Sequence, residues 1–220
     1  MTQLKFDETG SRKFEAGVDH VVLFVVDSVT KKYGTGIAWN GITTITESPS
    51  GADVTSLYAD NVKYLNLRAA EEFGATVEAY TYPKEFEVCD GSAELAPGVV
   101  IGQQGRATFG LVYRTKLGND VSGSDLGFKL HVVYGATASP TEKEYGTIND
   151  SPDALNPSWE LATTPVSVPG FLPTSVLTID STVVEPTKFK AVIDKLYGTD
   201  EPAGEPTFLM PNEIAALVGA

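Results

Sequence analysis

The sequence is poor in the residues on which most catalytic and metal sites depend. Its 220 residues include one cysteine, Cys89, and two histidines, His20 and His131. A single cysteine excludes an intrachain disulfide framework, and these few separated residues cannot supply the ligand set of a structural zinc site. We expect Cys89 to be a small, semi-buried hydrophobic residue rather than a nucleophile.

Long apolar runs are also missing. The longest, Val21 to Val26, suits a buried strand and is far too short for a membrane helix. Residues 1–17 contain no apolar stretch like that of a signal peptide, so we expect folding in the cytoplasm of the cell that makes the protein.

Basic residues are scarce, with 16 Lys and Arg against 29 Asp and Glu and a net charge of −13. This balance argues against a surface that binds nucleic acid, which requires clustered Lys and Arg. The simplest interpretation is a solvated acidic surface that keeps a concentrated protein soluble. A sharper one is that part of the charge lines a channel through which DNA slides, where attraction to the wall would hinder movement.

Motifs that define common enzyme classes do not occur. The chain has no G-x-S-x-G nucleophile elbow and no G-x-x-x-x-G-K-[ST] phosphate loop. Four aspartates are candidate calcium ligands by residue type, but they lack the spacing of an EF-hand: Asp53, Asp60, Asp120 and Asp125. We therefore expect no enzyme activity, no cofactor and no metal site.

Alternation of apolar and polar residues with period two dominates and predicts a mainly β chain. Asn40-Gly41 is a strong tight-turn signal between two of the strands. The predicted strands are Val18–Asp27, Tyr33–Asn40, Ile42–Glu47, Val54–Leu67, Phe73–Tyr82, Thr108–Lys116, Phe128–Gly135, Ser158–Thr164 and Ser175–Asp180.

Helical signals are few. Residues 186–197 place Phe189, Val192, Ile193 and Leu196 at helical spacing before Gly198, which predicts an amphipathic helix. Shorter helices are predicted for Lys84–Asp90, ended by Gly91, and for Pro211–Val218. Polar loops are predicted at Ser48–Asp53 and Gly118–Asp125.

Four segments together resemble the major tail (tail tube) protein of long-tailed bacteriophages of the siphophage type. They are Tyr58–Gly91 (Y-A-D-N-V-K-Y-L-N-L-R through E-V-C-D-G), Gly102–Asp120 (G-Q-Q-G-R-A-T-F-G-L-V-Y-R), Gly127–Ala136 (G-F-K-L-H-V-V-Y-G-A) and Tyr145–Val166 (Y-G-T-I-N-D-S-P-D-A-L-N-P-S-W-E-L). The likeness runs over whole segments in about the middle half of the chain.

The resemblance implies a β-sandwich or half-barrel of the phage tail tube type, with a flanking helix, extended loops and terminal arms. We expect an N-terminal arm at 1–17, the β-domain at 18–180, and a C-terminal helix and tail at 181–220 that pack on the domain or on a neighbour. Six copies would close into a ring, and stacked rings would form the hollow tail tube of a virion, assembled in the host cytoplasm. The implied partners are further copies of the chain and the tape-measure, tail terminator and tail tip proteins. DNA would pass through the lumen without specific binding, and no membrane is involved.

Candidate contact residues follow from this expectation. Ring stacking is assigned to the two polar loops, with Ser48, Pro49, Ser50, Gly51 and Asp53 in the first and Asn119, Asp120, Ser122 and Asp125 in the second. Segments 1–17 and 137–153 are further stacking candidates. The lumen is assigned to strands Ile42–Glu47, Leu57–Leu67, Thr108–Lys116 and Phe128–Gly135, with Glu47, Asp60, Arg114, Lys129 and His131 as lining residues. The alternative hypothesis is a non-enzymatic β-sandwich binding module on a virion or cell surface.

Overall fold

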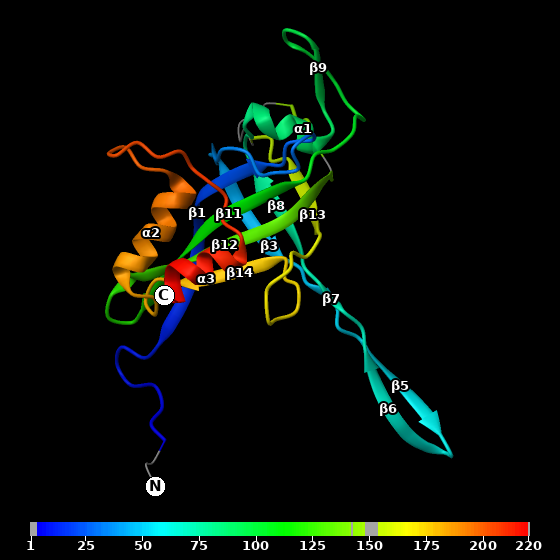
Figure 1. The fold of residues 1–220 in the computed structure, drawn as a ribbon, viewed down its shortest axis with the longest axis vertical. Helices are drawn as coiled ribbons and strands as arrows, with labels where there is room; N and C mark the ends of the chain where they lie inside the picture. The colour runs from blue at the N-terminus through cyan, green and yellow to red at the C-terminus, as the bar shows by residue number, and fades with distance from the viewer. Residues whose placement is uncertain (1–3, 142, 148–153, 220) are drawn as a thin grey trace.

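The computed structural model describes residues 4–141, 143–147 and 154–219 and is mainly β, which confirms the predicted fold class (Figure 1). Its strands are β1 Lys13–Val25, β2 Ile37–Trp39, β3 Ile42–Glu47, β4 Ser50–Gly51, β5 Val54–Ala59, β6 Val62–Arg68, β7 Glu71–Glu72, β8 Gly74–Ala79, β9 Ala93–Ala96, β10 Val99–Ile101, β11 Phe109–Asn119, β12 Gly123–Pro140, β13 Ser158–Thr163 and β14 Val176–Asp180. Its helices are η1 Lys84–Phe86, α1 Glu87–Asp90, α2 Pro186–Tyr197 and α3 Pro211–Gly219.

The main sheet curls because its two ends are joined by a two-residue connection. Its strand order is β2-β1-β11-β12-β13-β8-β3, so the terminal strands β2 and β3 are consecutive in the chain. Asn40 and Gly41 alone separate them, and Gly41 adopts the left-handed conformation with φ of 82°. The predicted tight turn is therefore present, but it brings the ends of a half-barrel together instead of forming a hairpin ladder between its flanking strands.

An aromatic core fills the inside of the curl. Phe86 packs against Trp39 and Trp159 with ring centroids 4.4 and 5.1 Å apart. The indole Nε1 of Trp159 donates a 2.8 Å hydrogen bond to the carboxylate of Asp90, which satisfies both buried groups. This bond ties the short helical segment η1–α1 to the core, and Gly91 ends that segment with φ of 81°, as the sequence predicted.

The outer face of the sheet is covered by α2 and α3 (Figure 1). Helix α2 spans the predicted residues, and its apolar side packs into a second core with Val22, Leu130 and Val132 of the sheet. Its first turn is capped by the carboxylate of Glu185, which accepts hydrogen bonds from the backbone N–H groups of Thr187 and Lys188. A single layer of sheet thus separates two apolar cores.

Strand β12 changes partner partway along its length. Its residues 129–133 pair with β14, whereas residues 136–140 pair with β13. Gly135 lies at the change with φ of 58°, and a Cβ atom there would lie 2.4 Å from the carbonyl oxygen of Thr164. The branch separates a four-stranded extension, β1-β11-β12-β14, from the curled part of the sheet.

A long two-stranded ribbon extends from the sheet edge (Figure 1). One side runs through β3, β4 and β5, and the other runs back through β6, β7 and β8. Asp60 and Asn61 form the tip with φ of 50° and 63°. The sequence prediction was wrong here in two respects: Ser48–Asp53 is part of this ladder rather than a free loop, and Leu57–Leu67 is two strands and their turn, outside the main sheet.

The second predicted loop is shorter than expected. Strand β11 continues to Asn119 and β12 begins at Gly123, which leaves a tight turn instead of the long loop predicted at Gly118–Asp125. The side-chain oxygen of Asn119 accepts hydrogen bonds from the backbone N–H groups of Val121 and Ser122. Strand β1 begins at Lys13, inside the predicted N-terminal arm, and residues 137–140 of the predicted stacking segment belong to β12. Residues 142 and 148–153 of that segment lie outside the described residues.

We predict that Gly135→Ala lowers the free energy of unfolding by roughly 2–4 kcal/mol, since it forces a left-handed alanine against the Thr164 carbonyl. Thermal unfolding followed by circular dichroism measures the change. Gly105→Ala is the control, because a Cβ atom there meets no atom within 4 Å. Equal stability of the two variants would contradict the assigned role of Gly135.

Candidate functional site

The four-stranded extension has one apolar face and one polar face. Strand pairs place Glu15, Thr115, Lys129 and His131 on one side, because Lys129 lies opposite Thr115 and His131 opposite Tyr113. Alternation places Leu130 and Val132 on the other side, under the helices. The sequence therefore forms a sheet segment with one apolar face buried under the helices and one polar face that is partly exposed, which we call the open face.

Arg114 lies on the helix-covered face, not with the predicted lumen residues. Its guanidinium donates hydrogen bonds of 2.6 and 2.9 Å to the two carboxylate oxygens of Asp19, and it lies over the ring of Phe128. The hydrogen bond from Arg114 is the main reason that the pKa of Asp19 is lowered. This ion pair forms where the β1 ladder is irregular, and His20 has φ of 52°, so it fixes a bend in the strand.

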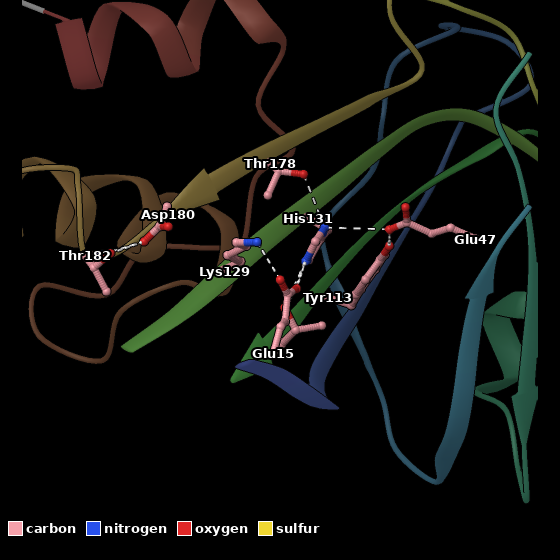
Figure 2. Close-up of polar contacts among 9 residues, drawn as sticks. Glu15, Glu47, Tyr113, Lys129, His131, Thr178, Asp180 and Thr182 are labelled. Atoms are coloured by element: carbon pink, nitrogen blue, oxygen red, sulfur yellow. Dashed lines mark hydrogen bonds and ion pairs between the residues drawn. The ribbon is translucent and has the colours of Figure 1, made fainter. Parts of the chain in front are cut away.

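His131 is the centre of a polar cluster on the open face (Figure 2). Its ring is 8% exposed and stacks on Tyr113 with centroids 4.7 Å apart. Nε2 lies 3.0 Å from the Thr115 hydroxyl, and Nδ1 lies 3.3 Å from the Thr178 hydroxyl. Carboxylates lie on both sides, with Glu15 3.4 Å from Nε2 and Glu47 3.8 Å from Nδ1. Burial lowers the pKa of His131 in spite of these two carboxylates, so the ring is neutral at pH 7.

Glu15 joins three strands within the cluster. Its carboxylate accepts hydrogen bonds of 2.5 Å from the Lys129 ammonium and from the Thr115 hydroxyl. Burial acts to raise the pKa of Glu15, but the bonds from Lys129 and Thr115 outweigh it and the pKa is lowered overall. The carboxylate is therefore charged and locally compensated.

Glu47 reaches the cluster from the opposite side of the curl. The Tyr113 hydroxyl donates a 2.5 Å hydrogen bond to its carboxylate. Burial, and next this hydrogen bond, raise the pKa of Tyr113, so the phenol remains protonated and acts as the donor. Glu47 is the last residue of β3, so this contact links the open face to the base of the ribbon.

Three of the five residues assigned to the lumen thus lie together in one cluster: Glu47, Lys129 and His131. Asp60 is at the ribbon tip, and Arg114 is on the other face. Sequence analysis did not assign Glu15, Tyr113, Thr115 or Thr178 to the site. Their strand alternation is visible in the sequence, but the pairing of β1, β11, β12 and β14 is not.

Both edges of the four-stranded extension are open in the part of the chain that the structure describes. Strand β2 pairs only with Val21–Leu23, so the first half of β1 has β11 as its one strand partner. Strand β14 pairs with β12 and has no strand on its other side among the described residues. Such edges present unpaired backbone groups that another chain can bind.

The outer part of the ribbon exposes apolar side chains on strands that have few other neighbours (Figure 1). Every residue of β6 is exposed, and the cross-strand pair Leu57 and Leu65 is 41% and 37% exposed. Tyr58 and Tyr64 are more exposed still. An isolated two-stranded ribbon is marginally stable in water, so this one is suited to burial against another surface.

The described residues contain no group of three or more His, Cys, Asp and Glu side chains placed to hold a metal ion. None of the described helices combines the length and the hydropathy that crossing a membrane requires. Cys89 is buried, and burial raises the pKa of its thiol to about 12.

No protein-family model and no curated protein matches the chain. Among solved structures, it is similar to a chain of the anti-feeding prophage baseplate, with 12% identity, 80% of this chain and 97% of that chain covered, and a TM-score of 0.35. It is also similar to chains from a PVC extracellular contractile injection system in the extended state. The sheath-tube complex gives 16% identity, coverage of 73% and 88%, and a TM-score of 0.30. The sheath/tube terminator gives 16% identity, coverage of 80% and 99%, and a TM-score of 0.30. At such identities and TM-scores, the likeness decides neither the family nor the function of this chain.

We predict that His131 makes the folded protein less stable as the pH falls from about 7.5 to about 5.5. Its folded-state pKa lies below the ordinary value of about 6.5, so the unfolded chain binds the proton more readily in this window. His131→Gln should therefore show a smaller drop in Tm across the window than the unmodified protein. His20→Gln, which alters an exposed imidazole, is the comparison variant against which the drop in His131→Gln is measured. An unchanged drop in the Tm of His131→Gln would show that His131 is not the source of this pH dependence.

Proposed function

We propose that the protein is a non-enzymatic structural subunit of a phage-type tail tube, in which six copies form a ring and rings stack into a hollow tube that conducts DNA. The observation that carries the proposal is the ribbon, an apolar two-stranded projection with exposed leucines and tyrosines. A surface of this kind is suited to a heterologous contact with another copy, which extends into a filament.

The four-stranded extension supports ring formation. Its open edges, on β1 and β14, lie at opposite sides of one sheet. Pairing of the β14 edge of one copy with the β1 edge of the next would satisfy the backbone hydrogen-bonding groups of both edges. It would also continue the sheet around a ring. Closure of the ring removes free edges, as in other β-barrels.

The open polar face would then line the channel. With His131 neutral, the cluster carries the charges of Glu15, Glu47 and Lys129, which leaves one net negative charge per copy. Lys129 is held by Glu15, so its ammonium is not free to bind phosphate. A lining that is weakly acidic and locally paired gives DNA little to bind.

We predict that Leu57→Glu with Leu65→Glu abolishes assembly and leaves the subunit folded. The two leucines form an exposed cross-strand pair, so the change places charge in the proposed stacking contact and changes the free energy of unfolding by only about 0.5–1 kcal/mol. Negative-stain electron microscopy at high concentration shows tubes or rings, and thermal unfolding reports the fold.

The control is Val29→Glu, which adds an acid at an 85% exposed apolar position in the β1–β2 connection, away from the ribbon. Tubes are expected from the unmodified protein and from the control. Normal tubes from the double variant would show that the ribbon is not part of the stacking contact. Small, uniform particles from the unmodified protein at every concentration would favour the binding-module hypothesis instead.

A further inference from the structure

The ribbon continues the sheet edge in one pairing register, although Gly51 and Ala52 within it adopt positive φ. From the Thr44–Glu78 pair to the Leu57–Leu65 pair, every step keeps the same antiparallel register through β3, β4 and β5. Backbone hydrogen bonds fill the positions between the named strands, with Ser48 bonded to Gly74. Because the register is constant, the direction in which β3 and β8 leave the sheet sets the starting direction of the ribbon.

The base of this ladder has a backbone partner on one side only. Strand β3 is the last strand of the sheet path, with β8 as its one strand partner among the described residues. Side-chain contacts restrain β3 instead, with Ile42 and Ile45 packed against the inner core. At the base of the ribbon, the Glu47 carboxylate accepts the hydrogen bond of Tyr113 and lies 3.8 Å from Nδ1 of His131 (Figure 2). A hydrogen bond to a charged acceptor is among the stronger side-chain contacts.

We propose that the hydrogen bond between Tyr113 and Glu47 sets the angle at which the ribbon leaves the sheet, so that the polar face and the ribbon are mechanically coupled. The inference rests on the proposed function in one respect, because the ribbon angle matters for stacking only if the ribbon is the stacking element. Under that function, a change at the channel wall of one ring is passed to the ring that its ribbon contacts. Tyr113 and Glu47 are positioning residues and need not touch the neighbouring copy.

The geometry favours Tyr113 as the fixed point of this coupling. Its ring is 3% exposed and is held between the inner core and the His131 ring. Glu47 is the partner that can move, because its side chain is 44% exposed. The buried phenol thus holds the last residue of an edge strand that has no backbone partner on one side among the described residues.

The test is the distribution of distances between two spin labels, one at the ribbon tip and one on the body. Lys63→Cys marks the outer end of the ribbon and Lys190→Cys marks α2, and both positions are exposed. The native Cys89 is buried with its pKa raised to about 12, so labelling is confined to the introduced cysteines. Measurement on dilute, unassembled subunit requires no tube formation.

Tyr113→Phe keeps the stacked ring and removes the hydroxyl, and we expect it to widen and shift the distance distribution. Tyr197→Phe is the matched control. It deletes a tyrosine hydroxyl bonded to the carbonyl oxygen of His20, away from the ribbon base, and should leave the distribution unchanged. Glu47→Ala should match Tyr113→Phe, whereas Glu47→Gln retains an acceptor oxygen and should restore the native distribution.

A narrow, native distribution in both Tyr113→Phe and Glu47→Ala would overturn the coupling, whatever the assembly assay shows. Absence of tubes from the unmodified protein would count against the proposed function. The spin-label measurement would still test the coupling, because it is made on the unassembled subunit. A variant that loses its thermal transition is set aside, and the pair Glu47→Ala and Glu47→Gln then decides the outcome.

Discussion

Closure of the sheet by Asn40 and Gly41 is the constraint on which the rest of the structure depends. A two-residue connection between the terminal strands requires the sheet to curl, and the curl gives it an inside and an outside. The inside holds the aromatic core around Phe86 and Trp159, and the outside binds α2 and α3. Strands β1, β11 and β12 are therefore apolar on both faces where they lie between the two cores. Where β12 pairs with β14 instead of β13, before Gly135, the polar cluster takes the place of the aromatic core on that face.

Much of the fold could be predicted because its signals are local. Helix α2 follows from apolar residues at helical spacing and from Gly198 after its last turn. Strand β13 follows from alternation between two flanking prolines, Pro157 and Pro165. The ribbon was missed at its tip, where Asp60 and Asn61 both adopt positive φ. An Asp-Asn pair between two β-prone runs favours such a turn, and this signal could have divided the long predicted strand.

The candidate site was less predictable because it depends on which strands become neighbours. Lys129 and His131 are two residues apart, so alternation alone places them on one face. Arg114 was assigned to the wrong face because its position opposite Leu130 follows from a long-range register that the sequence does not display. Glu15 lies in a segment that was expected to be a terminal arm, yet it is paired with β11 and bonded to Lys129. Local chemistry identified three of the seven cluster residues, and strand pairing supplied the other four.

During synthesis from the N-terminus, the apolar outer face of the sheet is made before the helices that cover it. All the strands of the sheet precede α2 and α3, and these helices supply much of the cover for Val22, Leu130 and Val132. Phe208, between the helices, packs against Phe24 and Tyr33 from the start of the sheet. Until residues 186–214 emerge, a nascent sheet has a bare apolar outer face as well as open edges, the two features that promote aggregation. Synthesis of residues 186–214 therefore determines when the subunit can accumulate at high concentration without aggregating.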